Sequence, residues 1–295
     1  MYFLGAPVVI FGGYQVITDH LVTVYDEKIF RNPETGIIPG AEPLVLGPEE
    51  SSRAALLVHG FAGTGNNFNE LPQRLASLGW YVRVMRLPGH GTSPRDLEKE
   101  TADSMIRAVR DELDGLSRSH SSVVLVGHSM GGTIAALVAV EKKVDCLVLC
   151  APYFGVTYKW YYILTAETWT HIAYPVIRWV HKSDIFVQVN RKEVKNKIVS
   201  YRWIPLHGVN ILLELGRRAN EPEVLNSITC PVLLLHSKND DAASWKCSKL
   251  AFEALHSIDK RVVWLNTSNH LLFWDYEYKK VYTDIEHFLS QQIVQ

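Results

Sequence analysis

The sequence lacks a basic cluster, a metal-ligand spacing of cysteines or histidines, and a glycine-rich phosphate loop. Its 295 residues include 30 Lys or Arg and 31 Asp or Glu, and no long run of either sign stands out. A nucleic-acid partner therefore has little electrostatic support. No dinucleotide fingerprint and no His-x-x-x-His pattern occurs, so we expect no catalytic metal.

Cysteine is scarce and scattered. The four cysteines lie in apolar or helical contexts, at Cys146, Cys150, Cys230 and Cys247. Their spacing suits neither a zinc site nor a redox pair, which predicts buried free thiols. Free thiols favour a reducing compartment, so we expect a cytoplasmic protein.

The chain begins with an uncharged stretch, residues 2–17, which contains three glycines and one proline. It is shorter than the roughly 20 residues that span a bilayer, and it lacks the positively charged start of a secretory signal. We expect residues 1–42 to form an apolar segment and an early strand. The apolar segment is expected to pack on the domain or dip into an interface, giving weak membrane-surface association. A partial membrane anchor is the alternative.

One segment combines a strand, a sharp turn and a helix. The apolar run Val123–Val126 leads into Gly127-His128-Ser129-Met130-Gly131-Gly132, and an Ala-rich helical pattern follows. The glycines on either side of Ser129 remove side chains that would clash in a strained turn. Gly-x-Ser-x-Gly alone is a weak signal, but the strand before it and the helix after it make it specific. We predict that Ser129 presents its hydroxyl above the edge of a sheet.

Apolar runs and helical patterns alternate along most of the chain. The predicted strands are Leu21–Tyr25, Pro43–Leu46, Ala54–Val58, Tyr81–Leu87, Val123–Val126, Val144–Cys150, Pro231–Leu235 and Arg261–Leu265. One predicted helix ends near Leu78, and the next spans Thr101–Ser117. A third follows Ser129, a fourth lies near Ser244–Leu255, and the last starts at about Asp275. This alternation predicts an α/β fold with a mostly parallel central sheet flanked by helices.

The alternation is interrupted between Ala151 and Thr229. This segment is rich in Trp and Tyr, and its helical periodicity is broken by prolines. We predict a mainly helical lid over 151–229, inserted into a core made of 43–150 and 230–295. Some lid aromatics are expected to face the cleft; the alternative is that they form only the lid's own small core. The candidate substrate contacts are Trp160, Trp169 and Trp203.

A serine hydroxyl needs a base, usually a histidine, and the histidine needs an orienting carboxylate. The loops after the last two predicted strands supply Asp240, Asp241 and His270. Because the carboxyl ends of parallel strands meet at one edge of a sheet, these residues should approach Ser129. We predict a triad of Ser129, His270 and Asp240, preferring Asp240 over Asp241 because it is nearer the strand end.

Acyl transfer also needs N–H donors for the developing oxyanion. The amide of Met130, directly after the serine, is one candidate. The amide of Phe61 is the other, because Gly60 and Gly63 let that loop turn toward the cleft. We expect Asp275 to cap the last helix. Loop packing explains the remaining histidines of the glycine-rich turns, which are His59, His90 and His128.

Three motifs carry a family resemblance: His59–Gly63, Leu87–Thr92 and Gly127–Gly132. Over most of residues 43–293 the chain resembles serine hydrolases of the α/β-hydrolase superfamily, and among them bacterial carboxylesterases and monoacylglycerol lipases. Ser237 and Asn269 stand where those enzymes often carry glycine.

The resemblance implies hydrolysis of carboxylic esters through an acyl-enzyme on Ser129. His270 would act as base and then acid, Asp240 would hold it, and the Phe61 and Met130 amides would bind the oxyanion. It implies no cofactor and a small-molecule or lipid-like ester substrate, with Phe61 and the lid aromatics as substrate contacts. The sequence leaves the oligomeric state open.

Other reactions use the same triad, including those of thioesterases, amidases, proline-type aminopeptidases and carbon–carbon bond hydrolases. An aminopeptidase would need a lid carboxylate, such as Glu167, Glu193 or Glu214, to hold the substrate amine. Dehalogenase and epoxide-hydrolase chemistry are disfavoured because the turn carries serine instead of aspartate. A non-catalytic hydrolase-like binding protein is the remaining alternative.

Overall fold

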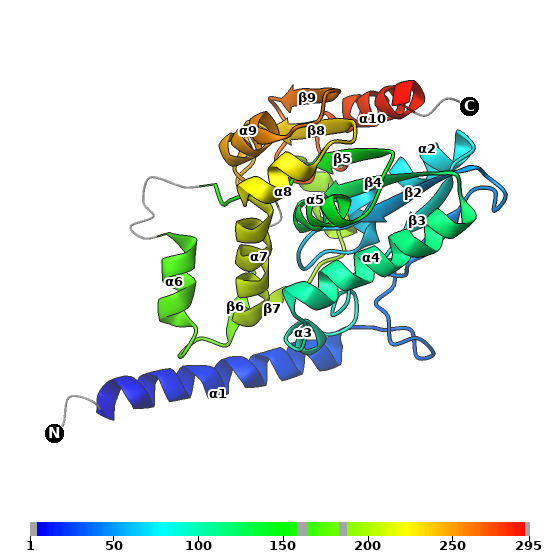
Figure 1. Cartoon of the computed structure of the whole chain (residues 1–295). Helices are drawn as coiled ribbons and strands as arrows, with labels where there is room; N and C mark the ends of the chain where they lie inside the picture. Colours follow the sequence, from blue (N-terminus) through cyan, green and yellow to red (C-terminus); the bar gives the residue numbers. More distant parts are fainter. Residues whose placement is uncertain (1–4, 158–164, 183–187, 293–295) are drawn as a thin grey trace.

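The computed structural model describes residues 5–157, 165–182 and 188–292. One sheet of seven strands runs through the molecule in the order β1-β3-β2-β4-β5-β8-β9 (Figure 1). The strands are β1 (Leu44–Leu46), β2 (Arg53–Val58), β3 (Tyr81–Val84), β4 (Ser122–His128), β5 (Cys146–Cys150), β8 (Val232–Ser237) and β9 (Lys260–Leu265). Only β1 is antiparallel to its neighbour within this sheet. The predicted mostly parallel α/β fold is confirmed.

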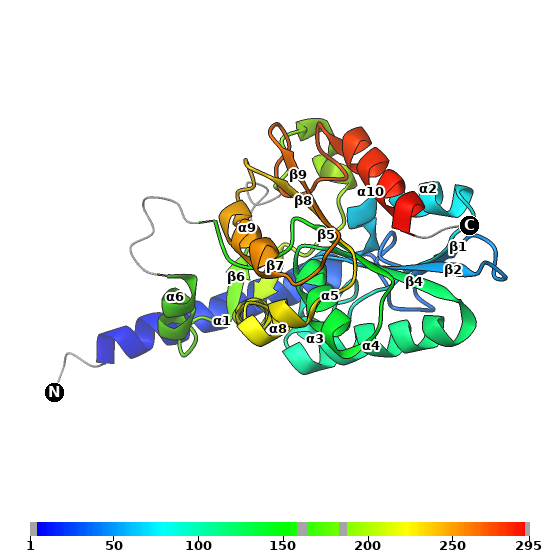
Figure 2. The ribbon, with the colours of Figure 1, turned by 45° about the horizontal axis from the view of Figure 1, so that its top comes forward.

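Helices cover both faces of this sheet (Figures 1 and 2). They are η1 (Gly65–Phe68), α2 (Leu71–Ser77), α3 (Pro94–Leu97), α4 (Ala102–Ser119), α5 (Met130–Glu141), α9 (Trp245–Ala254) and α10 (Tyr278–Gln292). Strand side chains alternate between the faces. Leu56 and Leu125 therefore pack in the layer that holds α4 and α5. Leu57 and Val126 pack in the other layer, with α2 and α10.

Helix α4 illustrates how local signals set an element. The Thr101 hydroxyl accepts the Ser104 N–H, and the Ser104 hydroxyl accepts the Thr101 N–H, each at 3.0 Å. This capping box satisfies amides that the first helical turn leaves unpaired. Met105, Val109 and Leu113 recur at helical spacing and are fully buried against the sheet.

The segment between β5 and β8 contains short helices and one small hairpin-like sheet. Its elements are α6 (Ala166–Ala173), β6 (Trp179–His181), η3 (Lys192–Lys197), β7 (Trp203–Pro205), α7 (Leu206–Ala219) and α8 (Pro222–Ser227). Strands β6 and β7 pair antiparallel, which the helical periodicity of the sequence did not indicate. The α7 helix packs against α5 and thereby joins this segment to the helix that follows Ser129.

Helix α1 (Gly5–Lys28) replaces the strand predicted over Leu21–Tyr25, and that prediction is wrong. The β-branched run favours a strand by local propensity alone. Contacts with the rest of the chain favour a helix instead. Thr18 and Val22, four residues apart and so on one helical face, are both buried. The Tyr25 hydroxyl accepts the backbone N–H of Arg202 at 3.0 Å.

The carboxylate of Asp19 ties α1 to the body of the molecule at three points. Oδ1 of Asp19 accepts hydrogen bonds from Arg95 at 3.2 Å, Arg178 at 3.0 Å and the Trp179 indole at 3.1 Å. The N-terminal end of α1 extends past the rest of the molecule (Figures 1 and 2). None of the described helices combines the length and apolarity that a membrane crossing requires.

Candidate active site

Ser129 occupies the sharp turn between β4 and α5. Its backbone has φ 54° and ψ −123°, a conformation that L-residues rarely adopt. The turn closes because its neighbours lack side chains. A Cβ on Gly131 would lie 2.0 Å from the Val58 carbonyl oxygen, and one on Gly127 would lie 2.5 Å from the Gly132 Cα. The glycines therefore allow the chain to cross β2 closely while the serine stays at the apex.

The structure brings Ser129, His270 and Asp240 into one chain of contacts. His270 follows β9 and Asp240 follows β8, both at the carboxyl edge of the sheet. Nε2 of His270 lies 2.8 Å from Oγ of Ser129, and its Nδ1 lies 2.7 Å from Oδ2 of Asp240. All three residues are buried, with Ser129 and His270 each 7% exposed. Nε2 can accept the serine proton while the carboxylate fixes the proton on Nδ1.

Asp240 is held as a carboxylate by four N–H groups. Its Oδ1 accepts the amides of Ala242 and Ala243, each at 2.8 Å. Its Oδ2 faces Nδ1 of His270 at 2.7 Å and Nε2 of His236 at 3.2 Å. Burial opposes ionisation, but the two imidazoles outweigh it and hold the pKa of Asp240 well below its usual range.

The neighbouring acids, Asp241 and Asp275, bond to loop residues and not to the His270 ring. Asp241 lies with its Oδ2 3.0 Å from Nδ2 of Asn269, not on His270. Asp275 does not cap the last helix as expected, because α10 starts at Tyr278. The Asp275 carboxylate instead accepts four backbone amides, those of Asn190, Arg191, Asn269 and Tyr276. It therefore fixes the loop that precedes His270.

Three further histidines line the same edge and bond to backbone. Nε2 of His59 accepts the Leu87 N–H at 3.0 Å, which ties the loop after β2 to the end of β3. Nε2 of His128 lies 3.1 Å from the His270 carbonyl oxygen. Burial, together with His270, lowers the pKa of His128 to about 3, and burial lowers the pKa of His90 to about 4. These rings are neutral supports for the loops near physiological pH.

The two amides predicted as oxyanion donors lie in the turns beside Ser129. Met130 is the first residue of α5, so its N–H has no intrahelical acceptor. Phe61 is in the loop after β2, where a Cβ on the adjacent Gly60 would lie 2.9 Å from Cβ of Ser129. That spacing brings the backbone of the Phe61 loop close to the serine. The Phe61 ring packs toward α7, near Gly208.

The predicted lid contacts are placed in part. Trp160 lies outside the described residues. Trp169, on α6, is 50% exposed. Trp203, on β7, packs edge-on against His181 with ring centroids 4.9 Å apart. Among the carboxylates named for an aminopeptidase, Glu193 pairs with Arg191 at 2.9 Å.

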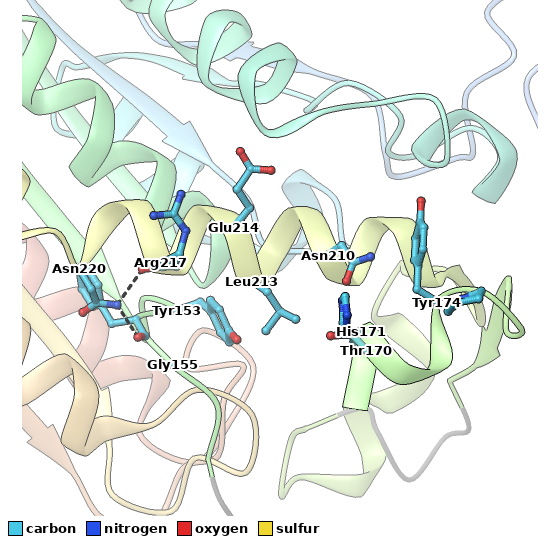
Figure 3. A pocket seen from close by; sticks show the side chains of 13 residues that line it. Tyr153, Gly155, Thr170, His171, Tyr174, Asn210, Leu213, Glu214, Arg217 and Asn220 are labelled. Atoms are coloured by element: carbon cyan, nitrogen blue, oxygen red, sulfur yellow. Dashed lines mark hydrogen bonds between the residues drawn. The ribbon is translucent and has the colours of Figure 1, made fainter. Parts of the chain in front are cut away.

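A pocket of about 580 Å³ lies between α6, α7 and the loop after β5 (Figure 3). Tyr153 lines it, and the Tyr153 N–H donates to the Ser129 carbonyl at 3.2 Å, but Ser129, His270 and Asp240 are not among the lining residues. Leu213 and Glu214 on α7 also line it, but their side chains point in different directions (Figure 3). The Glu214 carboxylate lies 3.5 Å from Arg218.

A serine on a strained turn, facing a histidine that faces a buried aspartate at the edge of a parallel sheet, defines a serine hydrolase with the α/β-hydrolase fold. Residues 49–277 match the family model Hydrolase_4, described as serine aminopeptidase, S33. This match covers most of the chain, and the protein belongs to that family.

Curated relatives of esterase and lipase type align with most of the chain. A thermostable monoacylglycerol lipase of Bacillus sp. (strain H-257) is 26% identical over 82% of this chain and 91% of its own. A carboxylesterase of Bacillus subtilis (strain 168) is 21% identical over 81% of this chain and 93% of its own. The predicted resemblance to these enzyme classes is confirmed, and the protein is a serine hydrolase of the esterase/lipase type.

Solved structures show the same fold. One of two metagenome-derived lipolytic enzymes superposes with a TM-score of 0.76 at 22% identity, covering 86% of this chain and 99% of its own. A soluble variant of monoglyceride lipase from Saccharomyces cerevisiae superposes with a TM-score of 0.75 at 15% identity, covering 86% of this chain and 92% of its own.

Proposed function

We propose that the protein hydrolyses carboxylic esters of apolar acids, as a carboxylesterase or monoacylglycerol lipase, through an acyl-enzyme on Ser129. The observation that carries the proposal is the unbroken set of short contacts from Ser129 through His270 to Asp240. Curated relatives named as a monoacylglycerol lipase and a carboxylesterase support the same reaction class. Residues 43–150 and 230–295 form the catalytic core in this proposal, and 151–229 form the lid.

In the first half-reaction, Oγ of Ser129 attacks the ester carbonyl carbon while Nε2 of His270 takes the hydroxyl proton. Asp240 stabilises the imidazolium that results. The amides of Phe61 and Met130 donate to the oxyanion of the tetrahedral intermediate. The bond between carbon and the alcohol oxygen then breaks, and His270 returns its proton to that oxygen.

In the second half-reaction, water takes the place of the alcohol. His270 removes a proton from the water as its oxygen attacks the acyl carbon. The intermediate collapses, the bond from carbon to Oγ of Ser129 breaks, and the serine regains its proton from His270. The products are the free acid and the alcohol, and the enzyme returns to its starting state.

We assign an apolar part of the substrate to the pocket between α6 and α7. Tyr153, whose backbone N–H donates to the Ser129 carbonyl, lines this pocket, and Leu213 adds an aliphatic wall. An aminopeptidase reading has weaker support, because the Glu214 carboxylate lies near Arg218 and its charge is already partnered.

A panel of substrates tests the proposal. It contains p-nitrophenyl esters of increasing chain length, a monoacylglycerol and an aminoacyl amide, each with wild type and Ser129→Ala. We expect hydrolysis of esters and monoacylglycerol by wild type, and loss of that activity in the variant. A kcat/KM for the amide above that for every ester would overturn the proposed substrate class.

We further propose that α1 rests on a lipid surface from which an apolar ester could be drawn. Val16 is 71% exposed and Ile17 is 61% exposed on the side of α1 away from the body. No Asp, Glu, Lys or Arg stands between residues 12 and 18, which favours shallow insertion of this part of α1. Asp19 holds α1 against Arg178 and Trp179, next to β6 of the proposed lid.

Flotation with phosphatidylcholine vesicles tests this attachment on the full chain. Burying two aliphatic side chains stabilises by about 3 kcal/mol or more in total. We therefore expect the Val16→Asp/Ile17→Asp variant to bind at least about a hundredfold more weakly than wild type. Ile258→Asp is the matched control, since Ile258 is fully exposed but lies before β9. No vesicle binding by wild type, or equal binding by the double variant, would contradict the attachment.

A further inference from the structure

A second imidazole contacts the carboxylate of Asp240. His236 lies in β8, four residues before Asp240, and its side chain is fully buried. Nε2 of His236 lies 3.2 Å from Oδ2 of Asp240 and 3.1 Å from the carbonyl oxygen of Ala243. None of the sequence motifs indicates this contact. The spacing of four residues across the end of a strand is the one signal that could have suggested it.

The two acceptors determine the protonation of His236. A carboxylate and a carbonyl oxygen can only accept, so Nε2 must carry a hydrogen. Nδ1 of His236 is buried and has no hydrogen-bond partner among the residues that the structure describes. A second proton there would be a buried, unpaired donor, which is costly. His236 is therefore the neutral Nε2–H form.

Both oxygens of Asp240 consequently carry two N–H donors. The Ala242 and Ala243 amides occupy Oδ1, while Oδ2 faces Nδ1 of His270 and the Nε2–H of His236, which is shared with the Ala243 carbonyl. Four donors use the whole acceptor capacity of a carboxylate. Donors that share one oxygen compete for its electron density, so each weakens the hold of Asp240 on the other.

We propose that His236 is a positioning residue that fixes Oδ2 of Asp240 and limits how strongly this carboxylate retains the proton on His270. The role rests on the proposed ester hydrolysis, in which His270 must be unprotonated at Nε2 before Ser129 attacks. Removing the His236 donor leaves the Asp240 charge less satisfied. Asp240 then attracts the imidazolium of His270 more strongly.

The other groups around His270 set the background for this effect. Ser129 faces its Nε2 at 2.8 Å, and the neutral ring of His128 lies with its centroid 5.1 Å away. Asp241 does not contact the His270 ring; its Oδ2 accepts a hydrogen bond from the side-chain amide of Asn269, the residue before His270, at 3.0 Å. Asp240 is the one carboxylate in direct contact with the ring among the described residues. A change at its Oδ2 is therefore transmitted directly to His270.

The pH dependence of kcat/KM tests the role. His236→Leu removes the donor, and we expect the acidic limb of the profile to move up by roughly 0.5–1 pH unit, with the alkaline plateau kept within about threefold. His236→Gln retains an N–H donor and should leave the limb within about 0.2 pH unit of wild type. His120→Phe is the control, because His120 is also buried but bonds to the Ser51 carbonyl, away from the triad.

A purely structural role for His236 gives a different result. If His236→Leu only loosened the packing, Asp240 would move away from His270. The alkaline plateau of kcat/KM would then fall, and the acidic limb would stay at the same pH or move to lower pH. That outcome, or equal shifts in His236→Leu and His236→Gln, would overturn the proposal. NMR titration of the His270 ring in Ser129→Ala, with and without His236→Leu, measures the same shift without turnover. If wild type cleaves no ester, the proposed function fails, yet this titration still decides the role of His236.

Discussion

Asp240→Asn is the substitution whose effect follows most directly from the site geometry. The carboxylate accepts two amides at Oδ1, each at 2.8 Å, and two imidazole N–H groups at Oδ2. An asparagine amide has one acceptor oxygen and one NH₂ donor, so one of these pairs must face NH₂. With the oxygen toward Ala242 and Ala243, the NH₂ meets Nδ1 of His270. The His270 proton then moves to Nε2, which can no longer accept from Ser129.

The expected loss in kcat/KM is about 10³–10⁴-fold, equivalent to about 4–5.5 kcal/mol of activation free energy. The assay is hydrolysis of a short-chain p-nitrophenyl ester, with thermal unfolding recorded for each variant to establish that it is folded. Asp241→Asn is the matched control. Its side chain contacts Asn269 at 3.0 Å and can keep that hydrogen bond, so we expect less than about a threefold change. Equal losses in the two variants, or more than a tenth of wild-type activity in Asp240→Asn, would refute the reasoning.

Two further predictions concern stability. Gly131→Ala places a Cβ 2.0 Å from the Val58 carbonyl oxygen and should lower the free energy of unfolding by about 3 kcal/mol or more. Gly115→Ala on α4 meets only the Arg118 guanidinium at 4.0 Å and should raise the free energy of unfolding by about 0.5–1 kcal/mol. Urea unfolding of both variants measures these changes. Burial lowers the pKa of His90 to about 4, so the unfolded chain binds a proton from about pH 6.5 that the folded chain does not. As the pH is lowered from about 6.5 to about 4, His90 alone should therefore reduce stability by about 1.4 kcal/mol per pH unit. His90→Phe should have a correspondingly shallower pH dependence of stability in urea unfolding, and an unchanged dependence would contradict the neutral, buried His90.

Much of the site could be predicted because it depends on local sequence and on topology. The strand before Ser129 and the helix after it are visible in the sequence, and parallel strands bring their following loops to one edge. Asp240 and His270 could thus be named before their contacts were known. The preference for Asp240 over Asp241 agrees with the geometry, in which Asp240 contacts the His270 ring.

The rest depends on contacts that local patterns do not encode. Leu21–Tyr25 has strand propensity, yet Asp19 and Tyr25 bond to distant residues and hold α1 as a helix. Asp275 stands near the start of a helix but binds amides of a segment that precedes it by about 85 positions. His236 reaches Asp240 only because the chain folds back sharply after β8. Between β5 and β8, an irregular series of short elements leaves no periodicity to interpret.

Covalent labelling of Ser129 tests the central claim most directly. A fluorophosphonate reacts with a serine only when a neighbouring base activates its hydroxyl. Intact-protein mass spectrometry should show one adduct per chain in wild type, peptide mapping should assign it to Ser129, and Ser129→Ala should remain unlabelled. An unlabelled wild type, an adduct on another residue, or labelling that survives in Ser129→Ala would contradict an acyl-transfer site built on Ser129, His270 and Asp240.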